Sequence, residues 1–76
     1  MIVISMYDGG YSFAVSIAGI RLYSGSIYND VVKITNSPLS ERDNLIKKFF
    51  KKYNKEFSNI YWCEDGAIIY NGKNLE

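Results

Sequence analysis

The middle of the chain carries the pattern that most limits its fold, because apolar residues recur there every three or four positions. This spacing places side chains on one side of an α-helix that packs on a core. The apolar set is Leu39, Leu45, Ile46, Phe49, Phe50, Tyr53 and Phe57, and the opposite side carries Lys47, Lys48, Lys51, Lys52 and Lys55. Ser37 is a suitable N-cap and Pro38 a suitable first helical residue. The pattern predicts one long amphipathic helix over residues 38–57.

The residues before this helix alternate between apolar and polar side chains, as half-buried strands do. Residues 2–7 place Ile2, Ile4 and Met6 on one face, and residues 11–18 alternate large apolar side chains with serine and alanine. Turn-forming residues at positions 8–10 and 18–19 end these two runs, and a third run begins at position 20. A β-prone run follows at positions 27–35. The stretch from position 20 to position 35 is therefore expected to form one bent strand or two short ones.

The end of the chain has the pattern of a β-hairpin. Two β-prone runs, residues 60–63 and 67–70, flank an acidic turn that contains an Asp-Gly pair, and such a pair favours a tight turn. With this pair at the tip, Trp62 would lie opposite Ile69. The polar residues 71–74 are expected to fray.

Together these elements predict an α+β fold in which residues 1–76 form one small domain. The expected order is β-β-β-α-β-β, with an antiparallel sheet of about five strands and one long amphipathic helix on one face. A single helix covers only one face of such a sheet, so the other face would be solvated or covered by a partner. A chain of 76 residues buries a limited core, and partner binding or oligomerisation is one way to stabilise it.

The residue types that most often carry chemistry are scarce. The chain has no histidine and one cysteine, Cys63, so an internal disulfide and the usual zinc site of four cysteine or histidine ligands are excluded. The missing histidine also excludes Ser-His and Cys-His nucleophilic pairs. Cys63 is expected to be an inert strand residue, and the acidic residues Glu64 and Asp65 a solvated turn. We therefore expect no enzymatic activity, no cofactor and no metal ion.

The lysine face of the helix, formed by the five lysines between positions 47 and 55, is the first candidate binding surface. Such a face could contact nucleic-acid phosphates or an acidic protein surface, although a lysine stripe more often only keeps a helix soluble. The net charge is +1, the pI is about 7.8, and the arginines are Arg21 and Arg42. Basic charge is low for a nucleic-acid-binding domain, so nucleic-acid binding is an alternative and not the leading hypothesis.

Aromatic residues form the second candidate surface, and they make up 16% of the chain. One helix cannot cover all of those expected in strands and loops, so some are expected to be exposed among Tyr7, Tyr11, Tyr23, Tyr28, Tyr61, Trp62 and Tyr70. Exposed tyrosine and tryptophan on a rigid sheet are frequent hot spots of protein interfaces. The alternative is that they are bulky core residues, since strands favour aromatic side chains in any case.

The leading functional hypothesis is a small non-enzymatic protein-binding module. The short chain is rich in Ile, Lys, Asn and Tyr, as AT-rich coding produces. These features suggest a stoichiometric inhibitor of a host enzyme or defence complex, encoded by a phage or mobile element and similar in size and style to anti-CRISPR proteins. The expected partner is a host protein or nucleoprotein complex. A small nucleic-acid-binding protein and a homodimeric structural subunit are the alternatives.

The expected location is the cytoplasm of the host cell. No segment approaches the ~20 apolar residues that span a membrane, and the first residues lack the basic region of a signal peptide. A single cysteine is also typical of a reducing compartment. We expect no contact with a membrane.

Overall fold

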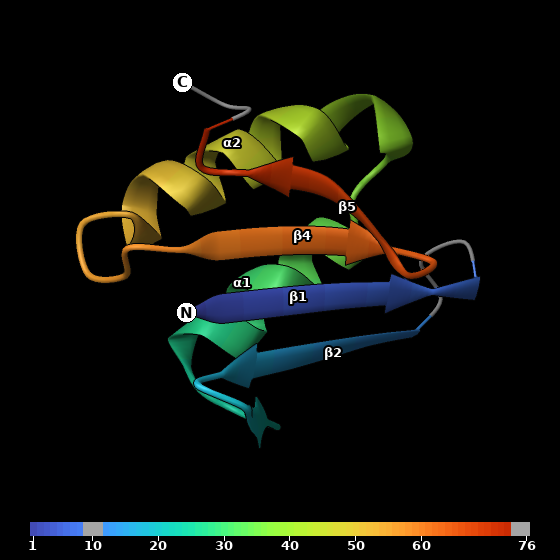
Figure 1. Cartoon of the computed structure of the whole chain (residues 1–76). Helices are drawn as coiled ribbons and strands as arrows, with labels where there is room; N and C mark the ends of the chain where they lie inside the picture. The colour runs from blue at the N-terminus through green and yellow to red at the C-terminus, as the bar shows by residue number, and fades with distance from the viewer. Residues whose placement is uncertain (9–11, 74–76) are drawn as a thin grey trace.

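The computed structural model describes residues 1–8 and 12–73, which form five strands and two helices (Figure 1). In chain order these are β1 (Ile2–Tyr7), β2 (Ser12–Ile17), β3 (Ile20–Leu22), α1 (Ser26–Thr35), α2 (Leu39–Tyr53), β4 (Ile60–Glu64) and β5 (Ala67–Asn71). The predicted α+β class, the five strands and the long amphipathic helix are confirmed. No helix in the described part of the chain is long and apolar enough to cross a membrane.

The sheet is mixed, with a single parallel pair. Its strands lie in the order β3-β2-β1-β4-β5, and all neighbours are antiparallel except β1 and β4, which run parallel (Figure 1). The predicted antiparallel sheet is confirmed for three of the four neighbouring pairs, and the pair of β1 and β4 departs from it. Parallel strands require a long crossover connection, usually through a helix, and here both helices lie in the connection from β3 to β4.

The β-prone run at positions 27–35, expected to be part of one bent strand or a second short strand, lies in helix α1 instead. Ile27, Val31 and Ile34 are spaced four and three positions apart and are all buried, which is the spacing of a helix face. The β-branched residues of this run favour strands, but burial of the helix face against the sheet overrides that preference. Gly25 precedes the helix with a φ of 107°, a conformation that other residues rarely adopt.

Helix α2 is shorter at both ends than the predicted range 38–57. Pro38 is its N-cap instead of its first helical residue, and the Ser37 hydroxyl donates a 2.7 Å hydrogen bond to a carbonyl oxygen of α1 instead of capping α2. The helix ends at Tyr53, so Lys55 lies in the turn that follows it. The amphipathic pattern itself is confirmed, since the buried residues of α2 are Ile46, Phe49, Phe50 and Tyr53.

Two tight turns have the geometry that their residues predict. Ala18 and Gly19 join β2 to β3, Asp65 and Gly66 join β4 to β5, and all four have positive φ angles, as type I′ hairpin turns require. The turn predicted at positions 8–10 includes two glycines that lie outside the described residues, as does position 74 of the predicted fraying end.

The register of the last hairpin differs from the predicted one. Trp62 lies opposite Tyr70 instead of Ile69, and Cys63 lies opposite Ile68, because a β-bulge interrupts the pairing between Trp62 and Cys63. Residues directly opposite one another share a face. Tyr70 therefore lies on the same face as Trp62, and Ile68 on the same face as Cys63.

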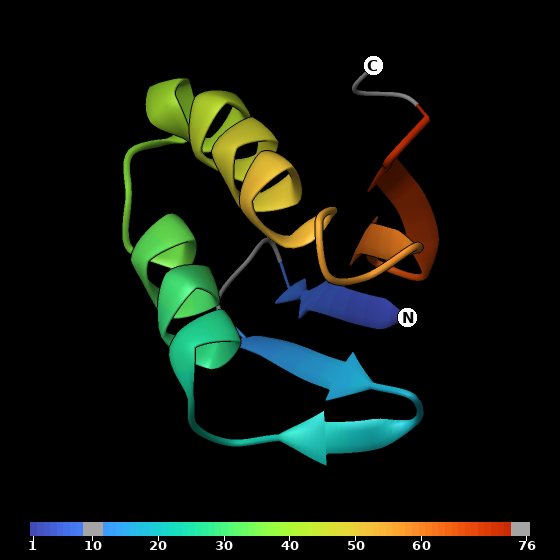
Figure 2. The same ribbon diagram turned by 90° about the vertical axis from the view of Figure 1, so that its left-hand side faces the viewer.

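Both helices pack on one face of the sheet (Figure 2). The buried core joins this covered face to the helices and contains Ile2, Ile4, Met6, Val15, Ile27, Val31, Ile34, Ile46, Phe49, Phe50, Tyr53, Ile60 and Trp62. The predicted apolar face of the first strand is thereby confirmed. In the described part of the chain no helix lies on the opposite face, which we call the open face.

Candidate functional site

The open face of the sheet carries almost no charge. The register places on it Val3, Ser5, Tyr7, Ser12, Ala14, Ser16, Arg21, Tyr61, Cys63, Ile68 and Asn71. Arg21 is the only charged residue among these described positions, and every one of them is at least partly exposed. The uncharged polar side chains of this face, mainly serines, stand beside the rings of Tyr7 and Tyr61 and the aliphatic side chain of Ile68. A surface of this mixed kind can meet water or another protein.

Three large side chains stand on the open face around a centre of small residues. Tyr7 is 46% exposed, Ile68 is 58% exposed and Tyr61 is half-buried. Between them lie Ser5 and Cys63, which are directly opposite each other on β1 and β4. Ile68 was missed by sequence reasoning, because the bulge in the last hairpin decides which face it occupies.

Tyr23 extends this aromatic surface beyond the short edge strand β3. Its side chain is exposed, and the guanidinium carbon of Arg21 lies 5.2 Å from the centre of its ring. Such a cation–π contact holds both side chains near the surface. Tyr7, Tyr23 and Tyr61 are therefore the predicted aromatic residues that the structure leaves accessible at or beside the open face.

Trp62 does not belong to the exposed aromatic surface. It is 1% exposed, and its ring packs edge-on against Phe49 of α2 at a centroid distance of 6.3 Å. The parallel register places it opposite Ile4 on the covered face of the sheet. The structure thus corrects the prediction that Trp62 is a binding residue.

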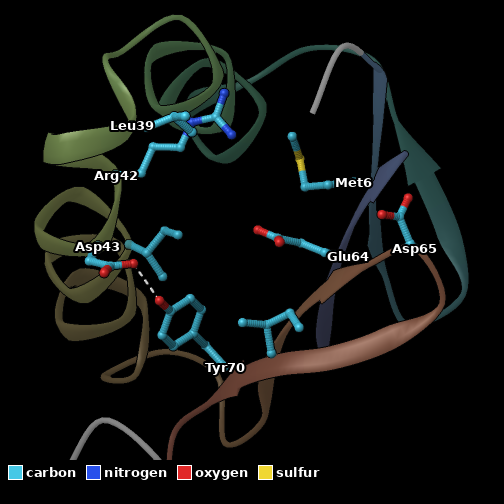
Figure 3. A pocket seen from close by; sticks show the side chains of 9 residues that line it. Met6, Leu39, Arg42, Asp43, Glu64, Asp65 and Tyr70 are labelled. Carbon is cyan, nitrogen blue, oxygen red and sulfur yellow. Dashed lines mark hydrogen bonds between the residues drawn. The ribbon is translucent and has the colours of Figure 1, made fainter. Parts of the chain in front are cut away.

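Two further aromatic residues also lie away from the open face. Tyr28 of α1 is half-buried and packs against Phe13 of β2 at a centroid distance of 5.3 Å. Tyr70 lies on the side of β5 that faces α2 (Figure 3). These two candidates therefore do not belong to the open face, and Tyr11 lies outside the described residues.

The predicted lysine face lies on the other side of the molecule. Its five lysines, Lys47, Lys48, Lys51, Lys52 and Lys55, are all exposed. Those within α2 alternate with its buried residues and project away from the sheet. The helix layer and the sheet therefore separate the lysines from the tyrosines of the open face. One nucleic-acid strand cannot stack its bases on these tyrosines while the lysines hold its phosphates, which is the usual arrangement in single-strand binding.

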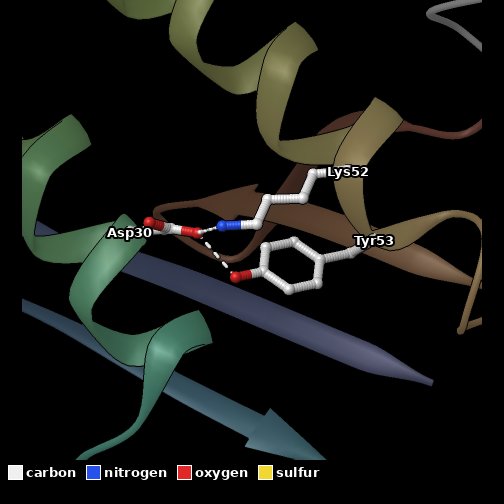
Figure 4. Close-up of polar contacts among 3 residues, drawn as sticks. All are labelled: Asp30, Lys52 and Tyr53. Atoms are coloured by element: carbon white, nitrogen blue, oxygen red, sulfur yellow. Dashed lines mark hydrogen bonds and ion pairs between the residues drawn. The ribbon is translucent and has the colours of Figure 1, made fainter.

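One of these lysines is paired within the chain (Figure 4). Lys52 Nζ lies 3.0 Å from Asp30 Oδ2 of α1, and the Tyr53 hydroxyl donates a 2.5 Å hydrogen bond to the same oxygen. Burial alone would raise the pKa of Asp30. The two hydrogen bonds, together with the charges of Lys52 and Lys33, outweigh it and hold the pKa below its ordinary value. These contacts join α1 to α2 and give Lys52 a structural role.

A hollow of about 260 Å³ lies where the beginning of α2 meets the β4–β5 hairpin (Figure 3). Its apolar lining is Met6, Leu39, Ile46 and Ile69, and its polar lining is Arg42, Asp43, Glu64, Asp65 and Tyr70. Leu39 is 77% exposed although it belongs to the apolar pattern of the helix. Sequence reasoning missed this hollow, because residues from three distant segments form it.

The charged residues of the hollow are not arranged as a metal site. No group of three or more His, Cys, Asp or Glu in the described part of the chain is placed to hold a metal ion. Arg42 Nη2 donates a 3.1 Å hydrogen bond to the carbonyl oxygen of Thr35, at the end of α1, where arginine commonly meets unpaired carbonyl groups.

The Tyr70 phenol loses its proton only at high pH, because its hydroxyl donates a hydrogen bond to an Asp43 carboxylate oxygen (Figure 3). This bond, with burial and the negative charges of Asp43 and Glu64, raises the pKa of Tyr70 to about 12. The folded pKa lies above the unfolded value of about 10. The neutral phenol therefore stabilises the fold fully below pH 10, and this contribution is lost as the pH rises to about 12.

An absorbance titration of the phenols tests this assignment. We expect Tyr70→Phe to remove one phenol from the group that ionises near pH 12. Tyr23→Phe, which removes an exposed phenol, is the matched control and should leave that late ionisation in place. An unchanged late ionisation in Tyr70→Phe would show that the bond to Asp43 does not hold the proton.

The thiol of Cys63 lies near the middle of the open face. It is free and half-buried, and burial raises its pKa above the ordinary value. A raised pKa lowers the fraction of reactive thiolate at neutral pH, which agrees with the expectation of an inert thiol.

Comparisons of the chain with known proteins found no match. No protein-family model, no curated protein and no solved structure matches the chain.

Proposed function

We propose that the chain is a non-enzymatic protein-binding module that presents the open face of its sheet to a partner protein. The observation that carries the proposal is the composition of this face, on which Tyr7, Tyr61 and Ile68 stand beside a single charged residue, Arg21. Cores of protein interfaces are enriched in tyrosine and arginine and depleted in lysine, aspartate and glutamate. The described positions of the open face match this pattern in their tyrosines, their arginine and the absence of Lys, Asp and Glu. Their three serines and one alanine do not, since interface cores are also depleted in these two residue types.

The size of the molecule is compatible with such an interface. A specific interface buries about 800 Å² on each partner. The chain has an accessible surface of 5047 Å², so an interface of this size would cover about a sixth of it.

A module of this kind acts by occupying a surface of its partner. We therefore propose a stoichiometric inhibitor of a host enzyme or defence complex, encoded by a phage or mobile element and acting in the host cytoplasm. The support for this part of the proposal is the composition of the chain, which is rich in Ile, Lys, Asn and Tyr as AT-rich coding produces. If each molecule of the chain occupies one site on one molecule of the target, inhibition should be complete when the two are present in equal amounts.

Affinity capture from a host lysate, with and without nuclease, tests the proposal. We expect one or two host proteins in near-stoichiometric amounts, retained after nuclease treatment and retained when salt is raised. A complex held by several phosphate contacts would instead lose orders of magnitude in affinity between about 50 and 200 mM salt. The measurement is mass spectrometry of the recovered proteins at both salt concentrations.

A double variant of the lysine face gives the matched control. Lys48→Glu combined with Lys51→Glu reverses two exposed charges on the far side of the molecule and should leave capture unchanged. Recovery of nucleoproteins that disappears with nuclease or with this variant would contradict the proposal and favour nucleic-acid binding. Self-association without any host protein would favour the homodimeric alternative.

A further inference from the structure

The outer edge of β5 is a second candidate binding surface. The proposed function, which concerns the open face, does not depend on it. β5 is the last strand in the sheet order, and no strand in the described part of the chain pairs with its outer side. Residues Ala67–Asn71 include no charged residue and no proline, which are common means of protecting an edge from pairing. An extended segment of another protein can add to such an edge through backbone hydrogen bonds.

The hollow beside this edge offers a place for an apolar side chain (Figure 3). Ile69 of β5 is 40% exposed and lines the hollow together with the more exposed Leu39 of α2. Behind them lie Met6 and Ile46, which are buried. The hollow has a volume of about 260 Å³. If an aliphatic side chain of a partner entered it, Leu39 and Ile69 would lose contact with water, which is favourable.

The charges of the hollow specify what should flank that side chain. Asp43, Glu64 and Asp65 line it, and none of them forms an ion pair with a described residue, since the ion pair of the described chain joins Lys52 to Asp30. Arg42, the one cation in the lining, already donates to a carbonyl oxygen of α1. Carboxylates without an ion-pair partner attract a positively charged surface.

We propose that the β5 edge and this hollow bind an extended segment of a partner protein in which an aliphatic residue has lysine or arginine two positions before and after it, on the same face of the strand. The segment pairs with β5 as a sixth strand. Its aliphatic side chain lies beside Leu39 and Ile69, and its basic side chains contact Glu64 and Asp65.

Two fluorescein-labelled peptides of alternating valine and threonine, with a central leucine, test this proposal. In one peptide arginines stand two positions before and two positions after the leucine, and in the other peptide glutamates occupy these positions. Fluorescence anisotropy with the whole chain should show the basic peptide binding at least about tenfold more tightly. A basic peptide that is N-methylated at consecutive positions has no free N–H on either edge for pairing with a strand, so we expect it to lose binding. Equal affinity of the basic and acidic peptides, or no binding of either at about 1 mM, would overturn the proposal.

Variants of the hollow locate the binding site. Ile69→Ser and Leu39→Ser should each weaken the basic peptide by about fivefold. Ile20→Ser, at an exposed residue of the opposite edge strand β3, is the matched control and should leave binding unchanged. Unchanged binding in Ile69→Ser would also overturn the proposal.

The contribution of charge and the independence from the open face are measured in the same assay. Glu64→Gln combined with Asp65→Asn removes two carboxylates and should abolish the preference for the basic peptide. Tyr61→Ala alters the open face and should not change peptide binding, so failure of this proposal and failure of the proposed function are distinguishable. A persistent preference in the double variant would show that these carboxylates do not select the peptide.

Discussion

Replacing Trp62 by alanine is expected to lower the free energy of unfolding by about 3–5 kcal/mol. Trp62 is 1% exposed and packs between the covered face of the sheet and Phe49 of α2, so its removal leaves a large cavity. A chain of 76 residues has a total stability of only about 4–11 kcal/mol. The variant should therefore lose between about a quarter and all of its stability. Urea denaturation followed by circular dichroism measures the loss, because the variant has no tryptophan fluorescence.

The matched control is Tyr23→Ala, which removes an exposed aromatic side chain and should change stability by no more than about 0.5 kcal/mol. The two variants separate a core aromatic residue from a surface one. If Trp62→Ala were as stable as Tyr23→Ala, Trp62 would have to lie at the surface, and the covered face of the sheet would be wrongly assigned.

The second large effect is expected at Tyr61. Tyr61→Ala should weaken the complex with the captured partner by about thirtyfold or more, the size typical of an interface hot spot of about 2 kcal/mol. Tyr61 lies directly opposite Val3 and Asn71 on the open face, where a partner that covers the face would bury its ring. Titration calorimetry with the purified partner measures the change in affinity.

Two other variants complete this measurement. Tyr7→Ala removes a more exposed ring of the same face and should also weaken the complex while leaving the fold intact. Lys51→Ala, on the exposed side of α2, should have no effect. Loss of affinity in Lys51→Ala with none in Tyr7→Ala or Tyr61→Ala would place the interface on the helix layer.

Local patterns predicted much of the fold. Alternation identified β1 and its buried residues Ile2 and Ile4, and helical spacing identified the buried side of α2. Two-residue turns with Gly19 and Gly66 were also predicted, because positive φ angles restrict the residues that occupy them. These features depend on interactions between residues that are close in sequence.

Helix α1 shows where local preference was misleading. Its run Val31-Val32-Lys33-Ile34-Thr35 is rich in residues that favour strands. The spacing of Ile27, Val31 and Ile34 was a usable signal for a helix, but it competes with that preference within a short run. Packing against the sheet decides between the two, and this packing involves residues far away in sequence.

The sequence predicted an exposed aromatic surface on the sheet, but it did not predict which residues of the last hairpin lie on that surface. Alternation implies that Tyr61 and Trp62 point to opposite faces, yet it does not say which face the helices cover. That choice follows from the parallel pairing of β4 with β1, which places Trp62 beside Ile4. The bulge after Trp62 then decides that Ile68 is on the open face and Tyr70 on the covered one. Both are long-range or irregular features that no local pattern specifies.

Alkylation of Cys63 tests the central claim most directly, because the only cysteine of the chain lies on the open face between Ser5 and Ile68. The rate of reaction with iodoacetamide is measured at about pH 8.5, where more thiolate is present, for the free chain and for its complex with the captured partner. We expect the complex to react at least about tenfold more slowly, because a protein that covers the open face excludes the reagent. An equal rate in the free chain and in the complex would show that the partner binds elsewhere and would contradict the account.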